Sequence, residues 1–479
     1  MIYFQSSRLL QSYLIERHLP KAVCVQRMLH TASMPHSRAI VNKVEPSNVE
    51  GHDAKMPPRP TPLSILPLPN LIRSFVVTSL SSSPALLSMA LRTLSYLAHS
   101  PSLMLNPERN PLLHLFLKKA FYDQFCAGET PSEVRETIQR LKQVGFSGVM
   151  LAYGKEIVLD HSDTADSARK IEEPAARDKL VQGDSDVQQW KQGALKTIDL
   201  THDGDFAALK YTGAGKEAVR LLMEGRSTPS KEISDALTEI CEAAKARGVG
   251  LLFDAEQNVV QKGIDSWTLA LQRKYNQDKA VVYNTYQAYL HSMPTVLLDH
   301  LHDAQRNGYV LGVKLVRGAY LASDPKELFC DDKTLTDQNF DGIAEALLTR
   351  DWNVNLKPPD KLFEFPGVDV ALATHNQDSV NKALHIQERR RREGKPVGGF
   401  VIGQLMGMAD EISCDLVLAN RRAGPEGHGP RAYQYLVWGS VRDCLKYLIR
   451  RAEENRDASV RARSTALALA KEIMRRVRL

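Results

Sequence analysis

The chain has 479 residues, which is enough for one large domain with extensions or for two to three ordinary domains. Hydrophobic residues make up 43% and charged residues 25%, which is typical of a globular protein with a sizeable core. The net charge of +6 is mild and does not require a nucleic-acid partner. Six scattered cysteines without a Cys-x-x-Cys pair argue against a zinc site or a disulfide scaffold and favour a reducing compartment.

Residues 1–43 have the composition of a mitochondrial transit peptide. Six basic residues stand against a single acid, Glu16, and the unbroken apolar core of a secretory signal is missing. Residues 44–70 are rich in proline, which blocks both helices and central strands. We therefore expect a transit peptide over 1–43 and a linker over 44–70.

Residues 71–130 are expected to form a helical extension with a candidate membrane-facing surface. The apolar, Ser-rich stretch 71–105 is interrupted by Arg73, Pro84 and Arg92, so it does not read as a transmembrane helix. A pair of amphipathic helices fits better, either packed on the main domain or lying on a membrane surface.

A regular alternation of apolar runs and amphipathic stretches fills residues 131–479. Strands that alternate with helices pair in parallel, and about eight such units in one series predict a distorted (β/α)8 barrel. No Gly-x-Gly-x-x-Gly follows any of these strands, which weakens a Rossmann alternative. The acidic stretch 157–193 is interpreted as an insertion between the first two units. The expected strands are 146–153, 206–213, 249–256, 280–288, 309–319, 368–375, 398–405 and 433–438.

Polar residues stand near the end of almost every expected strand, where a barrel gathers its chemistry. Their repetition predicts a polar rim around a large ligand. A barrel lysine, Lys210 or Lys314, could form a Schiff base, as aldolases do. Alternatively, amides could bond a flavin while Lys314 or Arg317 lies near its negative charge, and the amide-rich set slightly favours this reading. The rim residues are Lys210, Asp254, Glu256, Gln287, Lys314, Arg317, Thr374, His375, Asn376, Gln404 and Tyr435.

The segment 447–455 closes the rim with an arginine pair. On a helix, Tyr447, Arg450, Arg451 and Glu454 fall at i, i+3, i+4 and i+7 and share one face. Two adjacent guanidinium groups need an anion, and Glu454 neutralises one of them, which leaves donors for a ligand carboxylate or phosphate. The spacing therefore predicts an anion clamp rather than an ordinary solvated helix face.

Six ordered motifs within about residues 130–457 resemble the proline dehydrogenase (proline oxidase) family in its eukaryotic mitochondrial form. The combination of KLVRGAY and YLIRRAEEN is the most specific part. The motifs are DAEQ (254–257), NTYQ (284–287), KLVRGAY (314–320), ATHN (373–376), QLMG (404–407) and YLIRRAEEN (447–455).

The resemblance implies an FAD-binding barrel that oxidises L-proline to Δ1-pyrroline-5-carboxylate and passes electrons to a membrane quinone. It places the protein at the matrix side of the inner mitochondrial membrane, in peripheral contact with it. Independently of the resemblance, the spacing of the cysteines and histidines predicts no metal, and the composition predicts no nucleic-acid partner. Arg450 and Arg451 would hold the proline carboxylate, and Glu454 would fix their geometry. Tyr320, Tyr435 and Tyr447 would wall the ring, with Lys210 and Asp254 beside the pocket. The residues implied to line the flavin are Gln287, Lys314, Val316, Arg317, Gly318, Ala319, Thr374, His375, Asn376 and Gln404.

Two positions depart from the family pattern. Where many relatives read Tyr-x-Pro-Tyr-Gly, this chain has Val437 and Trp438, so the wall near Tyr435 is expected to differ. Where many relatives have an Asp at the end of the first strand, this chain has Ala152, so a contribution of that strand to the pocket is in doubt.

Alternatives come from three classes. A dehydrogenase for hydroxyproline or another cyclic secondary amino acid would use the same site. A Schiff-base aldolase would react at Lys210 or Lys314. A basic mitochondrial nucleic-acid-binding protein would use the arginine run 389–392 together with the basic tail 461–478.

Overall fold

The computed structural model describes residues 61–100, 102, 104–154, 176–358, 363–395, 398–424, 429–454 and 459–477. The chain divides into two compact units at Pro58 and Arg59, and all described residues belong to the second unit. The predicted transit peptide 1–43 lies outside the described residues, and the predicted linker 44–70 is described from Thr61 onward.

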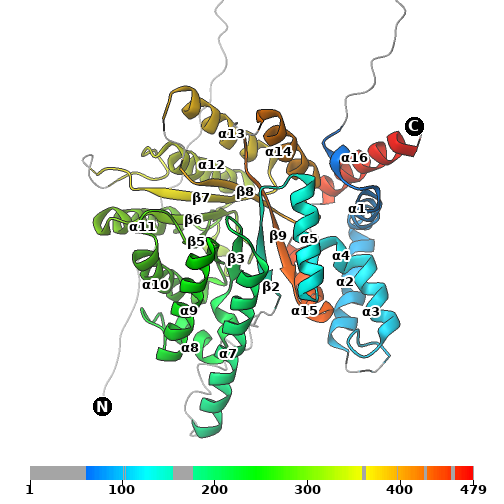
Figure 1. Cartoon of the computed structure of the whole chain (residues 1–479), viewed down its shortest axis with the longest axis horizontal. Helices are drawn as coiled ribbons and strands as arrows, with labels where there is room; N and C mark the ends of the chain where they lie inside the picture. Colours follow the sequence, from blue (N-terminus) through cyan, green and yellow to red (C-terminus); the bar gives the residue numbers. More distant parts are fainter. Residues whose placement is uncertain are drawn as a thin grey trace, which may run out of the picture. The chain divides into compact units, whose positions relative to one another are not determined.

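Within the described residues, nine parallel strands form one sheet, and eight of them close into a barrel (Figure 1). The closure is made by β9, which pairs with β2 on one side and with β8 on the other. The predicted (β/α)8 fold is therefore confirmed. The barrel strands are β2 (Gly148–Tyr153), β3 (Phe206–Leu209), β4 (Gly250–Phe253), β5 (Val282–Gln287), β6 (Leu311–Val316), β7 (Val368–Ala373), β8 (Phe400–Leu405) and β9 (Ala432–Trp438).

Helices surround the barrel, and several of them begin and end where the sequence supplies caps. Helix α5 starts after Thr130, whose side chain accepts the Glu133 N–H, and ends at Gly145 in the left-handed region. Ser230 and Gly248 bracket α9 in the same way. The helices are α5 (Pro131–Val144), α7 (Ala176–Leu200), α8 (Lys216–Met223), α9 (Lys231–Arg247), α10 (Asn258–Tyr275), α11 (Met293–Asn307), α12 (Lys333–Thr349), α13 (Gln377–Arg392), α14 (Asp410–Ala423), α15 (Val441–Glu454) and α16 (Ser459–Val477).

The barrel interior is filled near the start of the strands by three aromatic side chains. The ring of Phe206 meets Tyr283 and Tyr433 edge to face, with centroid separations of 5.4 and 5.5 Å. The Tyr433 hydroxyl donates to the Gly204 carbonyl at 2.8 Å. This aromatic floor closes one end of the barrel, so the polar residues at the other end surround a space with a solid base.

An N-terminal helical layer packs along α15 and α16 (Figure 1). It comprises η1 (Pro62–Ile65), α1 (Leu68–Ser81), α2 (Pro84–His99), α3 (Pro111–Leu117), η2 (Lys118–Tyr122) and α4 (Asp123–Phe125), followed by the short strand β1 (Cys126–Gly128) on β9. The Tyr122 hydroxyl donates to the Gly439 carbonyl at 2.8 Å, and Arg442 Nε donates to the Ala98 carbonyl at 3.0 Å. The layer thus fixes the beginning of α15, the helix that carries the arginine pair.

Among the described helices, none is by itself long and apolar enough to cross a membrane. Taken together, α1 and α2 have the length and composition of a span, but they are bent by 104° at the break between them.

Candidate active site

A cavity of about 350 Å³ lies at the carboxyl ends of the barrel strands and holds most of the predicted site. Parallel strands present their carboxyl ends at one rim, so residues far apart in sequence meet there. Eight residues that were not predicted also line this cavity: Met150, Ala255, Thr285, Leu321, Lys333, Ala373, Gly403 and Leu405. The predicted residues that line it are Lys210, Asp254, Gln287, Lys314, Val316, Arg317, Gly318, Ala319, Tyr320, Thr374, His375, Asn376, Gln404, Tyr435, Tyr447 and Arg451.

Asp254 is the centre of a charged cluster on one wall of the cavity. Lys314 Nζ lies 2.5 Å from Asp254 Oδ1, and Lys210 Nζ lies 3.9 Å from Oδ2. The Tyr435 hydroxyl donates to the same Oδ2 at 2.7 Å. Burial alone would raise the pKa of the Asp254 carboxyl, but the two lysines outweigh burial and hold the pKa below its usual value. The cluster of two ammonium groups and one carboxylate therefore leaves a net positive wall.

Tyrosine rings frame the cluster. Lys210 Nζ donates to the Tyr320 hydroxyl at 3.3 Å, and that hydroxyl donates in turn to the Ala255 carbonyl at 3.3 Å. The Lys314 ammonium lies 4.9 Å from the centroid of the Tyr435 ring. The aromatic faces thus lie beside the positive charges, which suits a flat ligand with an anionic group.

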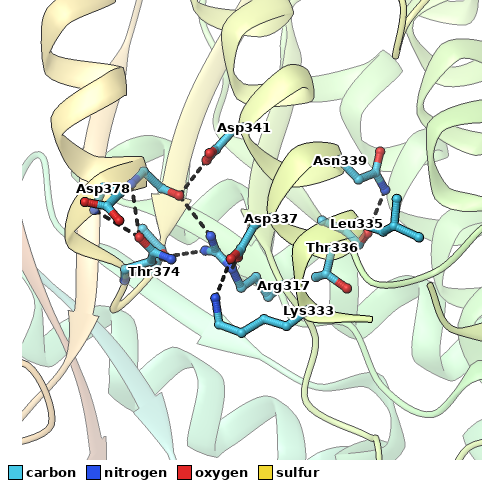
Figure 2. A network of polar contacts seen from close by, with 12 residues as sticks. Arg317, Lys333, Leu335, Thr336, Asp337, Asn339, Asp341, Thr374 and Asp378 are labelled. Atoms are coloured by element: carbon cyan, nitrogen blue, oxygen red, sulfur yellow. Dashed lines mark hydrogen bonds and ion pairs between the residues drawn. The ribbon is translucent and has the colours of Figure 1, made fainter. Parts of the chain in front are cut away.

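Arg317, directly after β6, connects three elements beside the cavity (Figure 2). Its guanidinium donates to Asp337 at 2.7 Å, to Thr374 at 2.7 Å and to Ser379 at 2.9 Å. It also stacks over the Phe340 ring at 4.3 Å. Lys333 pairs with the other oxygen of Asp337. The arginine therefore joins the end of β6 to α12 and to the β7–α13 turn, in addition to facing the cavity.

The side-chain amides at the rim differ in how many of their hydrogen-bonding atoms have partners within the protein. Gln404 accepts from Ser413 Oγ at 3.0 Å and donates to the Thr374 carbonyl at 3.3 Å. Asn376 Oδ1 caps α13 by accepting the backbone N–H groups of Asp378 and Ser379. Gln287 is 2% exposed, and its Oε1 atom has no hydrogen-bond partner among the described residues. A buried acceptor in that state favours a ligand donor at this position.

His375 has a defined proton position in its neutral form. Its Nε2 atom accepts the backbone N–H of Leu405 at 3.1 Å, so the ring proton lies on Nδ1.

The two arginines of the pair on α15 differ in their relation to the cavity. Arg451 lines the cavity, with its guanidinium carbon 5.6 Å from the centroid of the Tyr447 ring. Arg450 is half-buried and does not line this cavity among the described residues. The side chain of Glu454 lies outside the described residues, so its predicted role in orienting the arginines stays a prediction.

The two positions at which the sequence departs from the pattern described above lie beside the cavity. Ala152 and Val437 line a small chamber of about 40 Å³ that shares Lys210, Asp254, Tyr435 and Tyr447 with the main cavity. Trp438 instead faces α7, where its Nε1 donates to Thr197 at 3.0 Å and its ring contacts Tyr153. The altered wall is therefore formed by Val437 rather than by Trp438.

The arginine run 389–392 is largely engaged within the protein. Arg391 and Arg392 pair with Glu388, and the buried Arg390 donates to the Thr349 carbonyl at 2.5 Å. These contacts reduce the positive charge that the run offers to a nucleic acid.

Comparison with known proteins gives one consistent result. Residues 134–464 match the family model described as proline dehydrogenase. A probable mitochondrial proline dehydrogenase of Schizosaccharomyces pombe is 28% identical over 404 residues, covering 76% of this chain and 81% of that protein. A hydroxyproline dehydrogenase of Xenopus laevis is 30% identical over 390 residues, covering 75% and 78%.

The fold also matches a solved structure. Proline utilization A (PutA) from Bdellovibrio bacteriovorus superposes with a TM-score of 0.57 at 17% identity. The match covers 78% of this chain but spans only 38% of that much longer chain. This likeness concerns the barrel fold.

Proposed function

The chain belongs to the proline dehydrogenase family, and on that premise we propose that it oxidises L-proline to Δ1-pyrroline-5-carboxylate with FAD as its cofactor. The proposal includes electron transfer to a membrane quinone, at the matrix side of the inner mitochondrial membrane. The observation that carries it is the meeting of Arg451 and Tyr447 with the Asp254 cluster and the Gln287 amide in one cavity.

The residues of the cavity fit FAD. The buried, unpartnered Gln287 Oε1 suits a ring N–H, and the Gln404 amide and the His375 imidazole add further polar groups. Lys314 and Arg317 supply positive charge near the same ligand. Bound FAD would supply a two-electron acceptor for the hydride at C5 of proline.

The residues of the chain itself bind and orient the substrate. Arg451, which lines the cavity, holds the proline carboxylate through charge-assisted hydrogen bonds, while Tyr320, Tyr435 and Tyr447 enclose the ring. Glu454 is proposed to orient the side chains of Arg450 and Arg451 through its carboxylate. Anchoring the carboxylate reduces the freedom of the ring, so the carbon that gives up hydride is held in a fixed place.

The amine of proline must be neutral for its lone pair to expel hydride from C5. Lys210, Lys314 and Arg451 place three positive charges against the single carboxylate of Asp254 on the cavity wall. This field disfavours the ammonium form of the substrate, so no dedicated strong base is required.

A product assay tests the proposal. The purified protein with FAD, L-proline and a soluble quinone should form a pyrroline that an aromatic amino-aldehyde traps as a coloured adduct. NAD in place of the quinone should give none. Adduct formation with NAD alone, or no adduct with any quinone, would contradict the proposal.

Hydroxyproline is a second candidate substrate, favoured by the 30% identity to the Xenopus enzyme. The ratio of kcat/KM for L-proline to that for trans-4-hydroxyproline decides between them. We expect the ratio to exceed one, because the Tyr435 hydroxyl, which lines the cavity, already donates its proton to Asp254 and has none to donate to an added hydroxyl.

A Schiff-base aldolase is disfavoured by the same cluster. The amine of a Schiff-base lysine must be free to attack a carbonyl carbon, whereas Lys314 Nζ is buried and lies 2.5 Å from Asp254 Oδ1. Borohydride trapping of a carbonyl substrate on Lys210 or Lys314 would support the aldolase instead.

A further inference from the structure

The large apolar side chains that the described residues expose gather in one part of the molecule. Fourteen of the nineteen lie between Leu68 and Phe116 or on α16, and the other five lie elsewhere. Single exposed apolar residues are ordinary, but a concentration of this kind marks a surface that contacts another molecule. We call this surface the outer face. Its apolar residues are Leu68, Ile72, Val76, Leu86, Met89, Tyr96, Met104, Leu105, Leu112, Leu115, Phe116, Leu467, Met474 and Val477.

The helices of the outer face carry apolar side chains on more than one side. On α1, Leu71 is fully buried, whereas Ile72 and Val76 are 47% and 50% exposed. On α2, Met89 and Tyr96 are two turns apart and are 62% and 64% exposed. A helix that packs on its own protein needs only one apolar side. The second apolar side of these helices is therefore available to another molecule.

The helices that carry the outer face pack on one another. Helix α1 packs against α16, and α2 packs against α1 and α15. Leu94 and Leu97 of α2 pack in the same hydrophobic cluster as Leu113 and Leu117 of α3. Figure 1 shows α1, α2, α3 and α16 together on one side of the molecule, away from α8, α9 and α10. Their exposed apolar residues therefore belong to one region of the surface.

The same helices are strongly basic. Residues 68–122 include five basic residues and one acid, and α16 has the same balance. These ten bases and two acids carry a charge of +8, which exceeds the net charge of +6 of the whole chain. Positive charge beside exposed apolar side chains is typical of a surface that binds anionic lipid. Four of the bases are exposed and form no ion pair among the described residues: Arg92, Arg109, Arg463 and Lys471.

We propose that the outer face binds the surface of a bilayer that contains anionic lipid. The apolar side chains enter the boundary between headgroups and acyl chains, while basic residues such as Arg92 and Lys471 bind lipid phosphates. A second copy of the chain is disfavoured as the occupant, because a symmetric dimer through this face would bring like charges together. The membrane contact itself belongs to the proposed function, on which this inference rests, and the outer face is the surface that makes the contact.

Co-sedimentation with vesicles tests the apolar part of the outer face. The purified full chain with FAD should sediment with vesicles of phosphatidylcholine and phosphatidylglycerol. Met89→Glu should lower its partition coefficient by at least about tenfold, because a charge replaces a side chain that enters the bilayer. Val259→Glu places the same substitution at an exposed apolar position of α10 and should change the coefficient by less than about twofold. Phe116→Glu, on α3, serves if Met89→Glu does not fold.

Arg92→Gln tests the electrostatic part. It should lower the partition coefficient for vesicles that contain phosphatidylglycerol by about fivefold, because one basic residue near the anionic surface is lost. Binding to vesicles of phosphatidylcholine alone should stay the same. An equal loss for both kinds of vesicle, or no loss for either, would overturn the assignment to anionic lipid.

An activity assay and a mass measurement separate the failures. Turnover of L-proline with a soluble quinone should be unchanged in every variant, and its absence in the wild type would contradict the proposed function while vesicle binding still decides the surface. A wild type that stays in the supernatant, or a Met89→Glu chain that sediments as well as the wild type, would overturn the outer face as a lipid surface. A wild-type dimer that Met89→Glu converts to a monomer, with vesicle binding unchanged, would assign the face to a second copy and overturn the proposal.

Discussion

At the scale of single residues, Asp254 holds the cluster together. It faces two lysines and one tyrosine hydroxyl at the cavity wall, and it is 8% exposed. Removing its charge leaves Lys314 buried beside a second ammonium group. The single carboxylate therefore allows two positive charges to stand next to the substrate.

Asp254→Asn should lower the free energy of unfolding at pH 7 by about 3–5 kcal/mol, because it leaves a buried charge uncompensated. The pKa of Asp254 is lower in the folded protein than in the unfolded chain. The carboxylate therefore makes its full contribution to the free energy of unfolding when the pH is above the unfolded pKa of about 3.9. That contribution is lost as pH falls through the folded pKa. The free energies of unfolding of wild type and variant, measured with urea, should therefore differ at pH 7 and become equal in strong acid. A difference in these free energies that grows on acidification would contradict this role.

Arg451→Met should raise KM for L-proline on the order of 100-fold, since a charged hydrogen-bond partner of the carboxylate is lost. Steady-state kinetics would measure the change. Lys446→Met, on an exposed position of the same helix, is the matched control and should leave KM within about twofold. An unchanged KM in the Arg451 variant would remove the clamp from this residue.

At the scale of elements, the turn after β6 depends on a glycine. Gly318 has φ +145°, and a Cβ there would overlap the ring of Tyr289. The backbone therefore passes close to the ring on its way from Arg317 to Tyr320. Both of these residues take part in the site.

Gly318→Ala should weaken FAD binding by at least about tenfold, because the Tyr289 clash displaces the turn. FAD titration by fluorescence quenching would measure it. Gly308→Ala also sits at positive φ, but its Cβ would enter open space, so it should cost about 1 kcal/mol of stability and leave FAD affinity unchanged. Equal FAD affinity in both variants would mean that the turn does not support the cofactor.

The strands were predictable because each contains a short apolar run, but their ends were not: β3 ends at Leu209 and β4 at Phe253, whereas 206–213 and 249–256 were expected. Helix α7 was harder to predict. Its inward positions, Val187, Trp190, Ala194 and Ile198, repeat at helical spacing, but the first two lie in the acidic, glycine-containing stretch 157–193 that was interpreted as an insertion. That interpretation was wrong for residues 176–193, which belong to α7. Strand β1 has three residues and exists through its pairing with β9, so it carries no periodic signal of its own.

The sequence predicts which residues line the site better than it predicts which of them contact one another. Strand ends identify the rim, but the partners of Arg317, such as Asp337 and Ser379, come from helices that no local pattern links to β6. The Asp254 cluster likewise joins residues that are 60 and 181 positions apart. Lys333 was not predicted because it stands at the start of α12, away from any strand end.

At the scale of the whole molecule, the N-terminal layer supports the substrate helix. The buried hydroxyl of Tyr122 bonds the Gly439 carbonyl just before α15 begins. The layer also lines a hollow of about 550 Å³ with Val77, Thr78, Ser81 and Leu87. The same helices thus hold the start of α15 in place and border the hollow beside it.

Tyr122→Phe should reduce the free energy of unfolding by about 1–3 kcal/mol, because the Gly439 carbonyl loses its buried donor. Denaturant unfolding followed by circular dichroism would measure the loss. Tyr96→Phe, at an exposed position of α2, should change stability by less than about 0.5 kcal/mol. Similar values for the two variants would show that the layer does not depend on this bond.

An anaerobic titration with L-proline, followed by visible absorbance, tests flavin-dependent proline oxidation most directly. The purified protein should take up FAD and show a flavin spectrum that L-proline bleaches without oxygen or NAD. The spectrum should return when a quinone is added. A folded protein that takes up no flavin, or a bound flavin that L-proline leaves oxidised, would contradict the proposed activity.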